Sequence, residues 1–347
     1  MKRPLLLAAT AALALGACSS EEPDSLRLLA YESFPDDPEG PIALALDEFT
    51  AETGIDVDVV IAGDTGTMVS AAALTAGNPE GDVIWGVDNT FLSRAIDADV
   101  FEPYEADGLD AIPTELTDLV SDHEATPVDF GDVCVNYDIG ALDRMDLAPP
   151  TSFADLLLPE YSGMLVVENP GMSSPGLAFL LATIAAYGED GWEEYWQGLR
   201  ANDVKVANGW SEAYYGDFTR AGGDRPLVVS YGSSPPFEVL FAEEPLDEAL
   251  SGVVESTCFR QVEFAGILRG TDAPENAGQL VDFLISERFQ REVALNLFVF
   301  PANDSIALEP EFERYAAIPD DPITIDPSLI DANRTDWIER WNAVVLR

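Results

Sequence analysis

The sequence is poor in basic residues and contains a single histidine. Lysine and arginine together number 17, against 64 aspartates and glutamates, in 347 residues. Proteins that bind nucleic acid hold its phosphates with clustered lysine and arginine, so we expect no nucleic-acid partner. The acidic excess indicates a solvated acidic surface, whose field attracts cations and mildly repels anions over a reach of about 10 Å.

Motifs typical of enzymes are also missing. The sequence has no Gly-x-Ser-x-Gly elbow, no Walker A loop, no Gly-x-Gly-x-x-Gly after a strand and no zinc-ligand spacing. His123 lies in the acidic segment 121–124, where a solvated loop position is favoured over a catalytic base. Acidic residues are so numerous that no pair of them marks an acid–base site. We therefore expect a binding protein without cofactor or metal, rather than an enzyme.

No apolar run is long enough to span a membrane. The stretch Leu5–Leu15 is shorter than the roughly 18 residues that a spanning helix needs. Basic residues precede it and small residues follow it, which is typical of a signal peptide. Cys18 directly after the small residues makes the segment resemble a bacterial lipobox. The resemblance implies a signal peptide at residues 1–17, diacylation of Cys18, and a lipidated tether at residues 18–25 on the outer face of the cytoplasmic membrane. A simple secretory peptide or a short N-terminal anchor is the alternative.

Only two cysteines remain after Cys18. Cys134 and Cys258 would both stand in an oxidising compartment, where disulfides form and persist. Each lies in a run typical of a β-strand, residues 132–137 and 258–264, and the two runs could be neighbours. We expect a disulfide between them, and two buried free thiols are the alternative.

Segments typical of strands and helices alternate from residue 25 onward. Short apolar or alternating runs predict strands, and runs with apolar residues at helical spacing predict the helices between them. This alternation is typical of an α/β fold with mostly parallel sheets flanked by helices. The expected strands are 25–31, 55–61, 82–85, 163–167, 204–206 and 227–230, and the main expected helices are 42–53, 177–187, 191–199, 212–219, 273–285, 287–296 and 333–346.

The length of the mature chain predicts two lobes. Removal of the signal peptide leaves about 330 residues, more than the roughly 100–200 of a usual single domain. The strand–helix alternation starts again after residue 135. We expect lobe 1 at residues 26–133, lobe 2 at residues 134–258, and a return segment at residues 259–347 that completes lobe 1 and ends in a helix. The two cysteine runs fall where the chain crosses between the lobes.

Polar and aromatic residues follow several of the expected strands. The loops at the carboxyl ends of strands are where ligands bind in open α/β sheets, and binding sites combine aromatic faces with a few polar groups. Each aromatic taken alone is more often part of the core. The segments are Tyr31-Glu-Ser-Phe34, Asp64-Thr65, Asp88-Asn89, Ser173-Ser-Pro-Gly176, Gly209-Trp-Ser-Glu-Ala-Tyr214, Ser230-Tyr-Gly-Ser-Ser-Pro-Pro-Phe237 and Phe298-Val-Phe-Pro301.

In their order along the mature chain, these segments resemble the motifs of the thiamine-binding proteins of bacterial ABC importers. The tryptophan motif at residues 209–214 is the most specific of them. The resemblance implies the two-lobed Venus-flytrap fold of periplasmic binding proteins, a monomer that traps thiamine or a thiamine phosphate between its lobes and docks on the subunits of an ABC permease. The matching motifs are Tyr31-Glu-Ser-Phe34, Gly86-Val-Asp-Asn89, Ser173-Ser-Pro-Gly-Leu177, Gly209-Trp-Ser-Glu-Ala-Tyr214 and Ser230-Tyr-Gly-Ser-Ser-Pro235.

The resemblance also implies roles for individual residues. Trp210 and Tyr231 would pack on the flat rings of the ligand, where a cation over an aromatic face gains about 0.5–2 kcal/mol. Tyr31 and Asp64-Thr65 would contribute from lobe 1, with Asp64 offsetting the thiazolium charge. Ser173 and Ser174 would meet the hydroxyethyl or phosphate end, since exposed backbone N–H groups at residues 174–177 would suit a phosphate.

Two residues depart from the family pattern. Phe298 stands where a tryptophan is common, and Phe237 stands where a tyrosine is common. Phenylalanine keeps a stacking face but has no N–H or O–H donor. Together with the acidic surface, this favours free thiamine over its phosphates. Packing between the lobes without ligand contact is the alternative for both residues.

Three other functions stay open at this point. The adjacent tyrosines Tyr214 and Tyr215 suggest phenolate ligation of ferric iron, although no convergent set of oxygen ligands is evident. The acidic surface would suit a polyamine. A sensor or adhesion lipoprotein could keep the same fold without serving a permease.

Overall fold

The computed structural model describes residues 23–242 and 244–347. The predicted signal peptide and the lipidation site Cys18 lie outside the described residues, as does most of the predicted tether. In the described part of the chain, no helix combines the length and the apolar character that crossing a bilayer requires.

Lobe 1 contains three parallel strands in the order β2-β1-β3, namely β1 (Ser25–Ala30), β2 (Asp56–Ile61) and β3 (Val83–Asp88). Helices α1 (Pro41–Thr53), α2 (Thr65–Leu74) and α3 (Leu92–Asp97) connect or follow these strands. Helix α1 buries Ile42, Ala45, Leu46 and Phe49, whose spacing places them on one face of the helix. It ends at Gly54, where a left-handed backbone with φ of 80° favours glycine.

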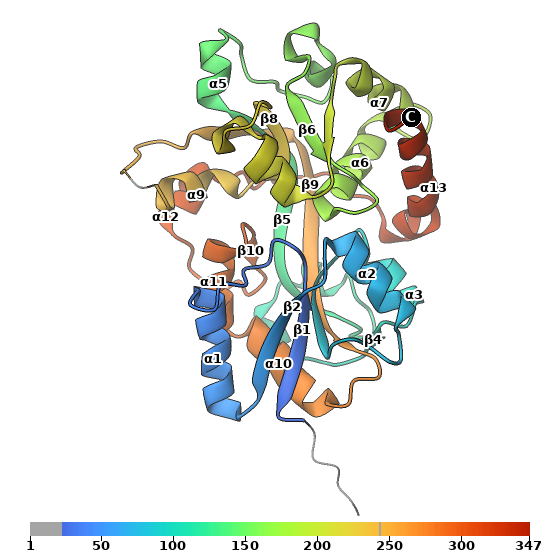
Figure 1. Cartoon of the computed structure of the whole chain (residues 1–347), viewed down its shortest axis with the longest axis vertical. Coiled ribbons are helices and arrows are strands. Elements are labelled where there is room, and N and C mark those ends of the chain that lie inside the picture. Colours follow the sequence, from blue (N-terminus) through green and yellow to red (C-terminus); the bar gives the residue numbers. More distant parts are fainter. Residues whose placement is uncertain (1–22, 243) are drawn as a thin grey trace, which may run out of the picture.

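Two long antiparallel strands, β5 (Thr126–Asp138) and β9 (Ser251–Leu268), run through both lobes. Figure 1 shows them along the vertical axis, with lobe 1 below and lobe 2 above. They stand at the centre of a single sheet of order β2-β1-β3-β9-β5-β8-β6-β7, with β4 (Phe101–Glu102) beside β9 and β10 (Phe300–Pro301) beside β5. The predicted lobe boundaries at residues 133/134 and 258/259 fall inside these crossing strands and stay predictions.

Lobe 2 contains the parallel strands β6 (Leu165–Glu168), β7 (Lys205–Ala207) and β8 (Leu227–Tyr231). Its helices include α5 (Ile139–Arg144), α6 (Ser174–Tyr187) and α7 (Trp192–Ala201). The predicted helix at residues 212–219 is instead the single turn α8 (Trp210–Glu212) followed by a π-helical turn over Ala213–Asp217. Helix α6 is buried around most of its circumference, which explains its nearly continuous apolar sequence.

The return segment supplies α10 (Pro274–Ile285) and α11 (Glu287–Asn296) to lobe 1. The chain then passes through α12 (Pro310–Tyr315), near α9 (Ser234–Leu240), and ends in α13 (Pro327–Val345). Helix α13 packs on α7 of lobe 2 and also contacts α3 of lobe 1. Figure 1 shows α13 along one side of lobe 2, with its lower end toward lobe 1.

The predicted disulfide between Cys134 and Cys258 is present. It joins β5 to β9 at an irregularity in their pairing, because Val133 pairs with Phe259 whereas Val135 pairs with Val254. Residues 255–258 therefore form a bulge opposite Cys134. Thr257 holds this bulge, since its hydroxyl accepts from the Val135 N–H and donates to the Val254 carbonyl. The bridge thus lies in the strands that connect the lobes.

Candidate functional site

A cavity lies between the lobes, where loops that follow strands of both lobes converge. The carboxyl ends of parallel strands gather loops at one edge of a sheet, which explains how distant segments meet here. The described lining residues are Tyr31, Glu32, Ser33, Asp64 and Thr65 from lobe 1, Ser174, Pro175, Trp210, Ser211, Tyr215 and Tyr231 from lobe 2, Glu263 from β9, and Asn296, Leu297 and Phe298 at and after the end of α11.

Tyr31 follows β1 directly, and its ring lies against the backbone of Gly86 on β3. Gly86 has a φ of 96°, and a Cβ at this position would overlap the Tyr31 ring. Glycine is therefore required here both by the backbone and by the ring that covers it. Gly131 on β5 serves Tyr231 in a similar way, since a Cβ there would lie 3.1 Å from Cδ1 of the Tyr231 ring.

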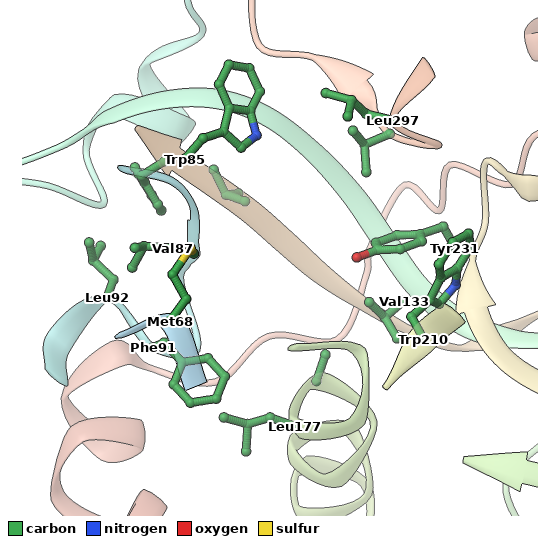
Figure 2. Close-up of a cluster of buried hydrophobic side chains, with 14 of the residues drawn as sticks. Met68, Trp85, Val87, Phe91, Leu92, Val133, Leu177, Trp210, Tyr231 and Leu297 are labelled. Carbon is green, nitrogen blue, oxygen red and sulfur yellow. The ribbon is translucent and has the colours of Figure 1, made fainter. Parts of the chain in front are cut away.

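Trp210 and Tyr231 stand side by side on lobe 2, as Figure 2 shows. The Trp210 indole N–H donates to the Ser230 hydroxyl at 3.0 Å, which fixes the ring on the strand that carries Tyr231. Tyr214 stacks on one face of Trp210 with ring centroids 4.9 Å apart. A flat ligand can therefore pack only on the other face of the indole.

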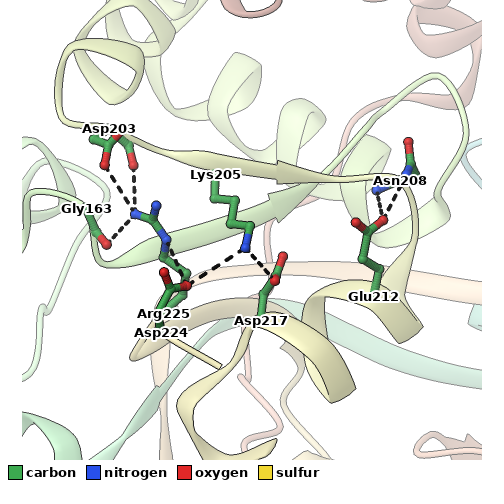
Figure 3. Close-up of polar contacts among 8 residues, drawn as sticks. All are labelled: Gly163, Asp203, Lys205, Asn208, Glu212, Asp217, Asp224 and Arg225. Carbon is green, nitrogen blue, oxygen red and sulfur yellow. Dashed lines mark hydrogen bonds and ion pairs between the residues drawn. The ribbon is translucent and has the colours of Figure 1, made fainter. Parts of the chain in front are cut away.

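The segment that carries Trp210 is held by polar contacts at both of its ends (Figure 3). The Glu212 carboxylate accepts from the backbone N–H and the side chain of Asn208, each at 2.9 Å, which caps the turn in front of Trp210. Lys205 on β7 pairs with Asp217 at the end of the π-helical turn, with 2.6 Å between Nζ and Oδ1. These contacts fix the turn from two sides and so position the indole.

Phe298 lines the cavity and contacts Trp210 edge-on at a centroid distance of 5.4 Å. Its backbone is left-handed, with φ of 62°, and its carbonyl accepts from the Ser233 hydroxyl. Phe237 stacks flat on Phe298 from behind, with centroids 3.7 Å apart, and belongs to a separate apolar cluster with Phe300 and Phe312. Phe237 therefore supports Phe298 without lining the cavity itself.

Asp64 caps the N-terminus of α2 and reaches toward lobe 2. Its Oδ1 accepts from the Thr65 N–H at 2.8 Å. Burial raises the pKa of Asp64 to about 7, with contributions from Glu32 and Asp88, although hydrogen bonds from the Thr65 and Ser174 backbones act in the opposite direction. The Ser174 N–H belongs to the first turn of α6, so the Asp64 carboxylate already occupies the positive end of that helix.

The start of α6 differs from the expectation of exposed N–H groups at residues 174–177. Ser174, Pro175, Gly176 and Leu177 are all buried, and the N-cap residue Ser173 is 0 % exposed. A carboxylate of the protein itself, rather than open solvent, faces this helix end. The Ser174 N–H is therefore engaged by Asp64, and the role of residues 174–177 as a phosphate cradle stays a prediction.

The two lobes touch each other in this structure. The Gly66 N–H of α2 donates to the Met172 carbonyl of lobe 2 at 2.8 Å. A Cβ at Gly66 would lie 2.8 Å from the same carbonyl oxygen, so glycine permits this approach. On the other lobe, a Cβ at Gly209 would overlap the Asp64 carboxylate. The structure thus describes a closed arrangement of the lobes.

Seven of the nine ligand-contact residues proposed from sequence line the cavity, namely Tyr31, Asp64, Thr65, Ser174, Trp210, Tyr231 and Phe298. Ser173 lies buried behind Ser174, and Phe237 lies behind Phe298. As expected, His123 is on an exposed loop. The residues at the end of β3 have structural roles, since Asp88 accepts from Thr90 and the Asn89 side chain bridges to the backbone of β9.

Three residues that line the cavity were not expected from the sequence. They are Glu263 on β9 and the pair Asn296 and Leu297, which precedes Phe298. Glu263 belongs to the run 258–264, which was interpreted only as a strand. Gln261 and Glu263 alternate with apolar residues there, and a charged residue inside such a run was the signal that could have identified it. Tyr215 was considered only as an iron ligand, and it is an exposed residue at the rim of the cavity.

None of the described residues that line the cavity is lysine, arginine or histidine. Its acidic members are Glu32, Asp64 and Glu263, and its flat surfaces are the rings of Tyr31, Trp210, Tyr231 and Phe298. In the whole described part of the chain, this cavity included, no group of three or more histidine, cysteine, aspartate or glutamate side chains is placed to hold a metal ion. Aromatic faces combined with carboxylates suit a flat cationic ligand.

The chain is similar in sequence and in structure to known solute-binding proteins. The sequence model of the family described as bacterial extracellular solute-binding protein matches residues 78–320. The thiamine-binding periplasmic protein of Escherichia coli is 28% identical over 322 residues, which cover 93% of this chain and 94% of that protein. A solved periplasmic thiamin binding protein has a TM-score of 0.82 and 26% identity, covering 93% of this chain and 96% of that one. Iron-bound HitA from Pseudomonas aeruginosa shares the fold at a TM-score of 0.72, with 20% identity. These similarities confirm the predicted two-lobed α/β fold.

Proposed function

Since this chain belongs to the bacterial extracellular solute-binding proteins, whose sequence model matches most of its length, we propose that it captures thiamine or a thiamine phosphate between its lobes. It then delivers this ligand to an ABC permease. Membership of the family confirms the prediction of an extracytoplasmic binding protein rather than an enzyme.

The observation that carries the choice of ligand is the composition of the cavity. Thiamine combines two flat rings with a permanent positive charge. The cavity offers the rings of Trp210 and Tyr231 on one lobe, the ring of Tyr31 on the other, and the carboxylates of Asp64 and Glu263. The aromatic rings of the cavity thus match the flat rings of thiamine, and the carboxylates match its positive charge. The relatives named thiamine-binding proteins support the same choice of ligand.

The location and organisation of the protein complete the proposal. The lipobox-like sequence supports diacylation of Cys18 and a tether at the outer face of the cytoplasmic membrane, close to the permease. Residues 26–133 and 259–347 would move as lobe 1 and residues 134–258 as lobe 2, with β5 and β9 as the connection. The ferric-ion alternative has in its favour the likeness of fold and a 21% identical relative named iron uptake protein A1, but the described residues offer no group of three or more histidine, cysteine, aspartate or glutamate side chains placed to hold a metal ion.

Calorimetry on the chain from Ser19 onward tests the proposed ligand. We expect thiamine or a thiamine phosphate to give a binding isotherm well below millimolar concentration, and ferric citrate and spermidine to give none. Binding of ferric citrate or spermidine without any heat from the thiamine compounds would reject the proposal and favour the iron or polyamine alternative.

Gly209→Ala is expected to weaken thiamine binding about tenfold. The new Cβ would overlap the Asp64 carboxylate, so the lobes could close on the ligand only after Asp64 gave up its hydrogen bonds at the start of α2 and α6. Gly216→Ala is the matched control, because a Cβ at Gly216 meets no atom within 4 Å and the residue lies on the same turn as Tyr215. Equal affinities of the two variants would show that Asp64 does not approach lobe 2 in the bound state.

A further inference from the structure

Three carboxylates lie in one row beneath the cavity. Glu263 on β9 pairs in register with Asp88 on the neighbouring strand β3 and with Asp129 on the other neighbour, β5. Asp88 and Asp129 are 0 % exposed and Glu263 is 4 % exposed. Like charges directly opposite each other on adjacent strands are destabilising, so this row needs a bound proton or a cation to offset its charge.

Glu263 is the member of the row that reaches the cavity. Its Oε1 accepts from the Gln261 side chain at 2.9 Å, and the same Gln261 amide donates to the Tyr231 hydroxyl at 3.1 Å. Its Oε2 is buried and accepts no hydrogen bond from an amide or hydroxyl donor of the described residues, and the Asp129 carboxyl lies within hydrogen-bonding reach of Glu263. Glu263 also lines the cavity, so this carboxylate is placed to meet a ligand beside Tyr231.

Among residues 23–242 and 244–347, no basic side chain neutralises Glu263. The titratable groups that face it are Asp88 from β3, Asp129 from β5, Tyr231 from β8 and Tyr31 after β1, and all of these are acids. Arg334 of α13 lies over the Phe91 ring and reaches only the Asp88 end of the row. Arg260, on the same strand as Glu263, is engaged by Asp132.

Burial and the neighbouring acids both favour the protonated form of the carboxyl groups in this row. Burial raises the pKa of Glu263 well above its usual value, and Asp129 and Asp88 raise it further. Burial likewise raises the pKa of Asp129. Two buried carboxyl groups side by side share a proton, because the second ionisation would place two charges together in a medium of low dielectric constant.

From this geometry we infer that Glu263 is the charge-selecting residue of the cavity. When a cationic ring binds beside Tyr231, the proton shared by Glu263 and Asp129 is lost to the solvent, and the ligand charge replaces it. The inference rests on the proposed function and narrows it, because the protein then selects unphosphorylated thiamine over thiamine phosphates.

The opposite wall of the cavity supports the same selection. A phosphate group would need N–H donors or basic side chains, yet the cavity wall has no basic residue and the start of α6 is taken by the Asp64 carboxylate. Glu32 adds a further negative charge at the rim. Both carboxylates would repel the phosphate group of a thiamine phosphate, whereas they attract the positively charged thiazolium ring.

Calorimetry on the intact mature chain tests the inference in two buffers that differ in heat of ionisation, phosphate and Tris. For the wild type we expect net proton release on thiamine binding at pH 7, and an affinity that rises with pH, because the ionised carboxylate binds the cation. We expect thiamine monophosphate to bind at least about tenfold more weakly than thiamine.

Glu263→Gln keeps the shape of the side chain and removes its charge. We expect this variant to release fewer protons than the wild type and to bind thiamine and its monophosphate with affinities that differ by less than about threefold. Glu255→Gln is the matched control, since it removes one exposed carboxylate from the same strand and should behave as the wild type. If Glu263→Gln does not fold, Asp129→Asn provides the second variant and should also reduce proton release.

The possible failures are distinguishable. If no thiamine compound binds the wild type, the proposed function is wrong. If thiamine binds but proton release and the preference over the monophosphate are the same in the wild type and in Glu263→Gln, the function stands and the inference is wrong. In that case Asp64 would be the source of the released proton.

Discussion

Replacement of Trp210 by alanine is expected to weaken thiamine binding by about thirtyfold or more. The indole is 8 % exposed, lines the cavity and has one face already covered by Tyr214, so its other face is the main flat surface that lobe 2 offers to a ligand. The change removes both the stacking surface and the attraction between the ring and the thiazolium charge. Calorimetry gives the affinity, and the quenching of tryptophan fluorescence by thiamine should disappear with it.

Trp210→Phe provides the matched control for this prediction. It keeps an aromatic face but loses the N–H that donates to Ser230, so we expect a loss of only a few-fold. An alanine variant with unchanged affinity and unchanged quenching would contradict the predicted role and assign Trp210 to the core of lobe 2.

Removal of the disulfide, by Cys134→Ala together with Cys258→Ala, is expected to lower the free energy of unfolding by about 2–5 kcal/mol. The bridge spans 124 residues of sequence and therefore restricts the unfolded chain strongly. It also joins the two strands that connect the lobes, so we expect the loss to be global rather than confined to one lobe. Urea unfolding followed by circular dichroism measures the effect.

The control for the disulfide is the wild type, unfolded with and without a reductant. The reduced wild type should unfold at the urea concentration of the double variant, and the oxidised wild type at a clearly higher one. Alkylation of the unfolded chain from Ser19 onward without reductant should add no mass. Two alkyl adducts, or identical unfolding of all three samples, would show that the bridge is not formed or does not stabilise the fold.

Much of the fold could be predicted from sequence because its signals are local. Apolar residues at helical spacing identify α1, with Gly54 at its end, and a continuous apolar run identifies α6. The pairing of strands that are far apart in the sequence has no such local signal. The crossing strands β5 and β9 extend well beyond the short runs around the two cysteines, because their length is decided by the partner strand and not by their own residues.

The site was predicted less completely, and the reasons differ between residues. Trp210 and Tyr231 were identified because they stand in motifs that follow strands. Phe237 and Phe298 look equivalent in sequence, yet one stacks behind the other, and only the packing of the return segment decides which of them lines the cavity. Glu263 was missed because its neighbours along the chain are those of an ordinary buried strand.

The sequence by itself determined the class of this protein and most of the segments that line the cavity, because composition and short motifs are properties of contiguous residues. Only the tertiary structure decided the charge of the cavity. Asp88, Asp129 and Glu263 are far apart along the chain and form one buried row only when β3, β9 and β5 pair. Asp64 likewise meets the start of α6 only when the lobes close, since electrostatic interactions depend on distance in space and not on separation in sequence.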